Sequence, residues 1–155
     1  MKKLLLFGII AIMAYACGSS TEKKEDNSQS TSEASNGNPS YDPNRGEGKF
    51  TKVDVSEHLD VAKAEGGKKV YDVKCSACHK LTGEKLVGPG WSGVTQRHQP
   101  EWIMNFITNT DEMITKDPKA QAQLEICLVR MPNQNLSDDD ARNIYEFMRQ
   151  NDGVK

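Results

Sequence analysis

The sequence predicts an all-α domain between residues 50 and 155, preceded by a short apolar leader and a polar linker. Apolar side chains of this domain recur at the three- and four-residue spacing of helices, and they do not alternate as in half-buried strands. The domain has no Gly-rich phosphate loop and no internal repeat. It holds 40 hydrophobic residues among 106, about 38%, a proportion that suits one modest core.

The first 16 residues have the three regions of a secretory signal peptide. Lys2 and Lys3 precede the apolar run Leu4–Met13, and the segment ends with Ala14-Tyr15-Ala16. The apolar run is too short to span a bilayer as a stable helix, so a single transmembrane anchor is the weaker alternative. We therefore expect residues 1–16 to direct export.

The residue after this leader is Cys17, and a small residue directly before a cysteine resembles the lipobox of bacterial lipoproteins. We favour lipidation of Cys17, because acyl chains on this residue would form a stable membrane anchor. Ordinary cleavage at Ala14-Tyr15-Ala16 is the alternative. Gly18 offers no aspartate-type retention signal for the inner membrane, which favours the periplasmic side of the outer membrane.

Residues 17–49 are expected to form the lipidated cysteine and a disordered tether. Among the 32 residues from 18 to 49, only Ala34 and Tyr41 are apolar and seven are serine. Such a segment buries too little apolar surface to fold. It would hold the domain of residues 50–155 away from the membrane.

Helix start signals mark the elements of the domain. A first helix is expected over about residues 56–74. A helix starts at Pro100, because proline suits the first helical position, and Asp117-Pro118 forms an N-cap and N1 pair for another. Ser137 and Asp140 form a capping box for the last helix. The stripe expected to face the core after Pro118 is Ala120, Leu124, Cys127 and Leu128.

The motif that carries chemistry is Cys75-Ser76-Ala77-Cys78-His79, a C-x-x-C-H sequence typical of c-type haem attachment. Two thiols at this spacing can reach the two vinyl groups of one porphyrin, and the adjacent histidine can bind the iron. A disulfide, a thioredoxin-like redox pair and half of a zinc site are the alternatives. Thioredoxin chemistry needs a βαβ context, and zinc needs further ligands, whereas the other cysteines are Cys17 and Cys127.

With this motif the chain resembles the class I c-type cytochromes, from about Leu59 to Arg149. The resemblance implies three to five helices wrapped around one covalently attached haem c. It implies that Gly67 and Tyr71 pack against the last helix, and that the Pro89 carbonyl accepts a hydrogen bond from His79. It also implies that Met131, before Pro132, supplies the distal thioether. The cofactor-binding residues are then Cys75, Cys78, His79, Pro89 and Met131, with His79 and Met131 on the metal.

The sixth ligand has rivals. Met131 stands between two helices before a proline, which frees it from helical packing. Met113, in a turn-rich stretch, is the main rival and His98 the second. Trp91 and Trp102 are expected to pack in the core, with a hydrogen bond to a haem propionate as the alternative for each. Cys127 is expected to be an inert thiol, with pairing to a non-lipidated Cys17 as the alternative.

His/Met ligation leaves no open position on iron, which suits electron transfer rather than catalysis. The expected function is a non-enzymatic electron carrier tethered to the membrane, with redox protein partners and no small-molecule substrate. The strings Val87–Trp91, Pro100–Trp102 and Arg130–Asn135 also resemble cytochromes that accompany periplasmic reductases, with nitrous oxide reductase as one candidate partner. The enzymatic alternative is a haem peroxidase or gas sensor with a labile distal ligand. A thiol oxidoreductase is a third hypothesis.

The net charge and the distribution of lysines limit the classes of binding partner. The net charge of −2 provides no overall basic field, so binding to nucleic acid has no support. Six lysines face three acids between Lys63 and Lys85. These lysines form either a positive rim that steers an acidic redox partner or ordinary solvated helix faces.

Overall fold

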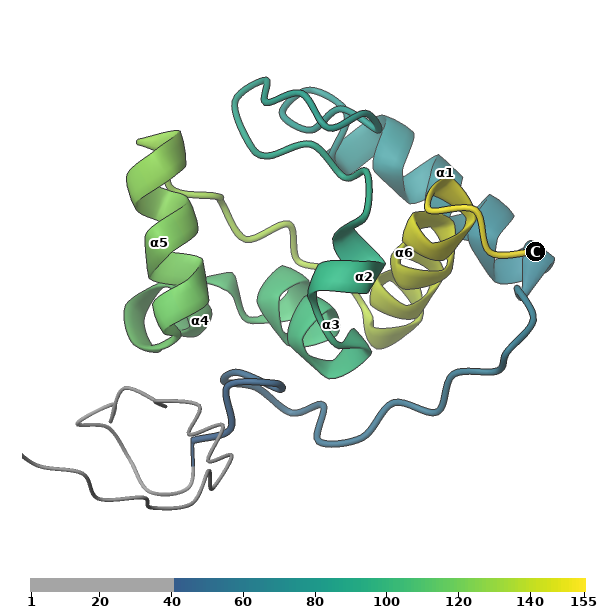
Figure 1. Ribbon diagram of the computed structural model, residues 1–155, viewed down its shortest axis with the longest axis horizontal. Coiled ribbons are helices and arrows are strands. Elements are labelled where there is room, and N and C mark those ends of the chain that lie inside the picture. Colours follow the sequence, from purple (N-terminus) through teal and green to yellow (C-terminus); the bar gives the residue numbers. More distant parts are fainter. Residues whose placement is uncertain (1–40) are drawn as a thin grey trace, which may run out of the picture. The chain divides into compact units, whose positions relative to one another are not determined.

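The computed structural model describes residues 41–155, and this part of the chain is helical (Figure 1). The described residues form six helices and no strand, apart from one isolated β-bridge between His79 and Lys85. The all-α prediction is confirmed, although six helices exceed the expected three to five. The helices are α1 (Val61–Lys74), α2 (Val94–Arg97), α3 (Pro100–Thr108), α4 (Thr110–Lys116), α5 (Pro118–Cys127) and α6 (Asp138–Asn151).

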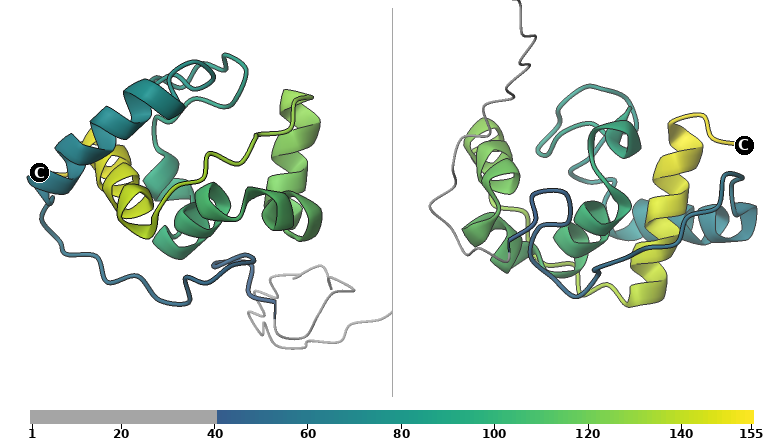
Figure 2. Two further views of the ribbon diagram at one scale, coloured as in Figure 1. Left: turned by 180° about the vertical axis from the view of Figure 1, so that it is seen from behind. Right: turned by 60° about the horizontal axis from the view of Figure 1, so that its bottom comes forward.

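Helices α1 and α6 cross each other in every view at one end of the domain, and they share the most extensive helix–helix contact (Figures 1 and 2). The crossing is close because Gly67 has no side chain. A Cβ at Gly67 would lie 2.0 Å from the backbone carbonyl oxygen of Asn143 on α6. Tyr71 packs against Phe147 nearby, with 5.4 Å between ring centroids. The predicted contact of Gly67 and Tyr71 with the last helix is therefore present.

The last helix begins as predicted. The Ser137 hydroxyl accepts a hydrogen bond from the backbone N–H of Asp140, and the Asp140 carboxylate accepts one from the backbone N–H of Ser137. This capping box satisfies two of the free N–H groups at the helix start. Farther along α6, Glu146 is fully buried and forms ion pairs with Arg142 at 2.7 Å and Arg149 at 2.9 Å.

The middle helices partly follow the prediction. Helix α3 begins at Pro100, and the Asp117 carboxylate caps α5 by accepting from the Ala120 N–H at 2.8 Å. The first helix begins at Val61 rather than near residue 56, because Asp60 provides its N-cap. Helix α4 was not predicted. Along α5 only Ala120 is buried, and Leu128 is exposed, so the stripe predicted for this helix is wrong at its end.

The segment Tyr41–Val55, which we call the strap, runs along α3 and α4 (Figure 1). The fully buried Asn105 side chain donates to the Arg45 and Phe50 carbonyls and accepts from the Phe50 N–H, all within 3.0 Å. The Tyr41 hydroxyl donates to the buried Asp117 carboxylate. Residues 41–49 were predicted to belong to the disordered tether, but they pack against the domain.

Within residues 41–155, no helix is long and apolar enough to cross a membrane. The predicted signal peptide, the lipidation predicted at Cys17 and the part of the predicted tether up to residue 40 lie outside the described residues.

Candidate functional site

The C-x-x-C-H segment forms a tight turn at the end of α1. The backbone N–H of Cys75 donates to the Tyr71 carbonyl, and the N–H groups of Cys78 and His79 both donate to the Cys75 carbonyl. These bonds place the two thiols and the imidazole on consecutive turns. Cys75 and Cys78 are free thiols rather than a disulfide in this structure. Burial raises the pKa of Cys75 to about 11, so its thiol is protonated at neutral pH.

The imidazole of His79 is held in one orientation. Its Nδ1 lies 2.9 Å from the Pro89 carbonyl oxygen, which can only accept, so Nδ1 carries the proton and Nε2 is free to bind a metal. Burial lowers the pKa of His79, which keeps the ring neutral. Gly88 makes room for the ring, because a Cβ there would lie 2.3 Å from Cε1 of His79. The contact with Pro89 is the one that the resemblance implied.

An aromatic cluster connects His79 to the α1–α6 crossing. The Tyr71 hydroxyl donates to the His79 carbonyl at 2.7 Å. The Trp91 ring lies 4.9 Å from the Tyr71 ring and 5.8 Å from the imidazole, centroid to centroid. Trp91 is therefore buried and packs beside His79. The sequence singled out Tyr71 only as a packing residue, so its hydrogen bond to the motif was missed.

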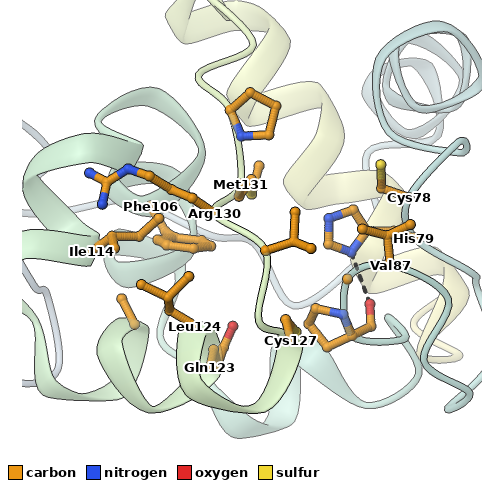
Figure 3. Close-up of a pocket in the computed structure, with 15 residues that line it drawn as sticks. Cys78, His79, Val87, Phe106, Ile114, Gln123, Leu124, Cys127, Arg130 and Met131 are labelled. Atoms are coloured by element: carbon orange, nitrogen blue, oxygen red, sulfur yellow. Dashed lines mark hydrogen bonds between the residues drawn. The ribbon is translucent and has the colours of Figure 1, made fainter.

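Met131 reaches the site from the opposite side. Helix α5 ends in Leu128, whose left-handed φ of 60° turns the chain toward Met131. Arg130 fixes the next part of this segment through an ion pair with Asp111 at 3.0 Å. Figure 3 shows His79 and Val87 on one side of a cavity, and Met131, Phe106 and Leu124 on the other. The structure therefore brings Met131 and His79 to the same space.

The rivals of Met131 are placed elsewhere. Met113 is fully buried, its sulfur accepts from the Glu47 N–H at 3.0 Å, and it borders none of the three cavities beside His79. Met104 and Met148 are buried in the core. His98 does border one of these cavities, but it stacks on Trp102 with 4.0 Å between ring centroids. Met131 is the methionine that faces His79 across the cavity.

The cavities suit a flat group with one apolar edge and one polar edge. His79 and Met131 border all three cavities, so the empty space of the site surrounds these two residues. One cavity, with about 570 Å³ of empty space that includes the solvent at its mouth, is lined by Cys78 and the apolar Val87, Ile114 and Leu124. A second, of about 830 Å³, borders neither Cys75 nor Cys78 and includes Arg97 and His98.

The polar end of this space contains an unsatisfied group. His98 Nδ1 is buried and has no hydrogen-bond partner in the described chain. Burial, followed by the charges of Lys119 and Arg97, lowers the pKa of His98 to about 4. A carboxylate of a bound porphyrin would satisfy Nδ1, because vinyl and propionate groups lie on opposite edges of haem. The residues present therefore fit haem. The Trp102 indole donates to Asp117 at 3.0 Å, which favours its structural role.

Sequence reasoning missed the contribution of α5. Gln123, Leu124 and Cys127 all border the cavity, so this helix forms one wall of it. Cys127 is a free thiol beside the site rather than a core residue. The zinc alternative finds no support, since residues 41–155 contain no cluster of three His, Cys, Asp or Glu side chains suited to a metal.

Comparison with known proteins agrees with this geometry. The model of the cytochrome c family matches residues 64–152, which is more than half of the chain. A cytochrome c from Rhodothermus marinus is 33% identical, with a TM-score of 0.66, and the match covers 68% of this chain and 90% of the other.

Engineered forms of the Rhodothermus marinus protein match with similar scores. The variant Rma TDE is 32% identical, with a TM-score of 0.65 and the same coverage of both chains. The same variant bound to a carbene intermediate is 32% identical, with a TM-score of 0.62 and again the same coverage. No curated protein matches the chain. The chain belongs to the cytochrome c family, whose cofactor is one covalently bound haem c with its iron.

Proposed function

We propose that this chain is an exported, membrane-tethered monohaem cytochrome c that passes single electrons between respiratory components. Membership of the cytochrome c family supports the role of electron carrier. The observation that carries the finer proposal is that His79 and Met131 border the same cavities, beside the thiols of Cys75 and Cys78.

Each site residue has a defined task in this proposal. Cys75 and Cys78 would hold the haem by adding their S–H groups across its vinyl groups, and His79 Nε2 and the Met131 sulfur would bind its iron. The bound haem supplies an iron that gains or loses one electron. The Pro89 carbonyl holds the Nδ1 proton of His79, which fixes the ring and strengthens Nε2 as a donor. Thioether ligation favours reduced iron and raises the potential.

The chain is proposed not to be an enzyme, because His79 and Met131 would both bind the iron and leave no open position for a substrate. The apolar cavity walls, with Val87, Ile114 and Leu124 among them, exclude water from the cofactor. Exclusion of water reduces the solvent reorganisation that accompanies each electron transfer. A haem peroxidase or gas sensor would instead need Met131 to leave the iron.

The proposed location is the periplasmic side of the outer membrane, with Cys17 as the lipid anchor. This part of the proposal rests on the sequence of residues 1–49 alone. A periplasmic reductase such as nitrous oxide reductase is the proposed electron acceptor. Stopped-flow mixing of the reduced protein with that enzyme tests the partner, and a rate no faster than buffer would remove it.

The ligand assignment is tested by spectra of the haem-loaded protein and of Met131→Ala. We expect the wild-type ferric form to show the weak near-infrared band of methionine on iron, and the variant to lose it and to bind CO rapidly when reduced. Met113→Leu is the matched control and keeps the band. Loss of the band in Met113→Leu would contradict the assignment of Met131 as the ligand, and rapid CO binding by the wild type would contradict the carrier function. A colourless exported protein would favour thiol chemistry.

A further inference from the structure

The segment that carries Met131 has few contacts of its own with the rest of the domain. Among the described residues, no backbone–backbone hydrogen bond involves residues 129–136, which lie between α5 and α6. Two side-chain contacts tie this segment to helices. The Lys74 ammonium donates to the Gln134 carbonyl at 2.9 Å, and the Arg130 guanidinium binds Asp111 near the start of α4. Arg130 is next to Met131 in the chain, so the position of Met131 depends on the position of α4.

The contact between Arg130 and Asp111 fixes a position more than it adds stability. Arg130 Nη2 donates to the Asp111 carboxylate at 3.0 Å and to the Asp111 carbonyl at 3.2 Å, and Nε donates to the same carboxylate at 3.2 Å. In Figure 3 the Arg130 side chain extends away from His79, toward Ile114 of α4. Both partners are exposed, so the ion pair contributes little free energy. Its consequence is geometric, because it passes a shift of α4 on to the residue beside it.

Helix α4 is in turn held along its length by the first part of the strap. The Asn109 side chain, at the N-cap of α4, donates to the Glu47 carbonyl at 3.3 Å, and the Glu47 N–H donates to the Met113 sulfur at 3.0 Å. At the C-cap, the Tyr41 hydroxyl donates to the Asp117 carboxylate. A helix of seven residues has little stability of its own, so these contacts set its position.

The contact between Tyr41 and Asp117 is costly to lose. The Asp117 carboxylate is fully buried, and besides Tyr41 it accepts from the Trp102 indole at 3.0 Å and from the Ala120 N–H at 2.8 Å. Burial, together with the hydrogen bond to Asp117, raises the pKa of Tyr41, so its hydroxyl keeps the proton that it donates. A buried carboxylate that loses a donor loses stabilisation that water does not replace.

We propose that the strap positions Met131 through α4. Tyr41 and Glu47 hold the helix in place, and Asp111 near its start then holds Arg130. This inference rests on the proposed function, in which Met131 binds the iron. Tyr41, Glu47 and Asp111 border none of the three cavities, so they act through other residues and are positioning residues. When the strap is loosened, α4 shifts and Met131 leaves the iron more often.

The test measures how readily an external ligand displaces Met131 in the haem-loaded full chain. Neutral imidazole binds the ferric iron only where Met131 has left it, so its apparent affinity reports the fraction of molecules with Met131 released. Tyr41→Phe is the variant, because it removes only the hydroxyl that donates to Asp117. Glu101→Ala is the matched control, since Glu101 on α3 accepts one strap hydrogen bond, from the Val53 N–H at 2.7 Å.

We expect Tyr41→Phe to raise the apparent affinity for imidazole severalfold, up to about tenfold, and Glu101→Ala to leave it unchanged. Hydrogen exchange at the Asp117 amide, which donates to the Met113 carbonyl at 2.8 Å, should become faster in Tyr41→Phe. An unchanged affinity or unchanged Asp117 exchange in Tyr41→Phe would overturn the proposal, and so would an equal rise in affinity in Glu101→Ala.

A double-mutant cycle tests the route from the strap to Met131. Asp111→Ala removes the ion pair between α4 and Arg130, and we expect it to raise the imidazole affinity by itself. Once this contact is lost, adding Tyr41→Phe should raise the affinity little further. Full additivity of the two substitutions would show that the strap does not act through Asp111, and would overturn the proposed route.

Failure of this inference can be told apart from failure of the proposed function. If the wild type lacks the near-infrared band of methionine on iron, or if Met131→Ala keeps it, Met131 is not the ligand and the proposed function fails as well. If Met131→Ala loses the band but Tyr41→Phe binds imidazole as the wild type does, only the role of the strap is removed.

Discussion

Replacement of Asn105 by alanine is expected to release the strap from α3. Asn105 is fully buried, and its side chain makes three hydrogen bonds to strap backbone at 2.9, 3.0 and 2.9 Å. At about 1 kcal/mol each, these bonds contribute about 3 kcal/mol. The variant also leaves the Phe50 N–H and two carbonyls without partners, so we expect the free energy of unfolding to fall by about 3 kcal/mol or more.

Guanidinium unfolding of the haem-loaded protein measures this loss, and hydrogen exchange at the Phe50 amide locates it. Asn109→Ala is the matched control, because the Asn109 side chain makes one hydrogen bond to the strap, with Glu47 at 3.3 Å. We expect the control to lose about 1 kcal/mol or less. A loss below about 1 kcal/mol in Asn105→Ala, or an unchanged exchange rate at Phe50, would refute the view that Asn105 holds the strap.

Three more outcomes follow from contacts described above. Gly88→Ala should displace the His79 ring, because the new Cβ would lie 2.3 Å from Cε1, and the ferric spectrum and thermal midpoint should both change; identical spectra would contradict the close contact. Glu146→Ala should lower the free energy of unfolding by about 3–5 kcal/mol, since it leaves Arg142 and the buried Arg149 unpaired, and a denaturant titration that finds less than about 1 kcal/mol would refute this. The hydrogen bond from Lys63 lowers the pKa of Asp60, so the stability that Asp60 contributes is present above its unfolded pKa and is lost as pH falls through its lower folded pKa. Asp60→Asn should therefore weaken the acid dependence of unfolding below about pH 4, and an unchanged dependence would exclude this role.

Helix starts could be predicted because their signals are local. Ser137 and Asp140 bond to each other within one turn, and Asp117 caps the helix that Pro118 begins. Helix α4 was missed although Asn109 and Glu112 have the spacing of a helix start, and the Asn109 side chain makes no cap in the structure. Its buried residues Met113 and Ile114 depend on contacts with the strap and α5. A short stretch of sequence does not reveal contacts with residues so far away in the chain.

Some residues of the site could likewise be predicted from a local pattern, and others could not. Cys75, Cys78 and His79 are adjacent in sequence, so their chemistry could be inferred from spacing alone. Pro89 and Met131 followed from the family resemblance, and the structure places both beside His79. The wall formed by α5 could not be predicted, because Leu124 and Cys127 are only half-buried and face a cavity rather than a neighbouring helix.

The strap also fixes which end of α5 lies beside Tyr41, where the described chain begins. Tyr41 binds Asp117 at the first turn of α5, whereas Ile126 and Leu128 lie at its last turn. A ten-residue helix is about 15 Å long. Any force applied through the chain before Tyr41 therefore acts at one end of α5 and leaves the opposite end unobstructed. In the proposed tethered protein, the membrane anchor would therefore join the domain beside the first turn of α5, away from Leu128.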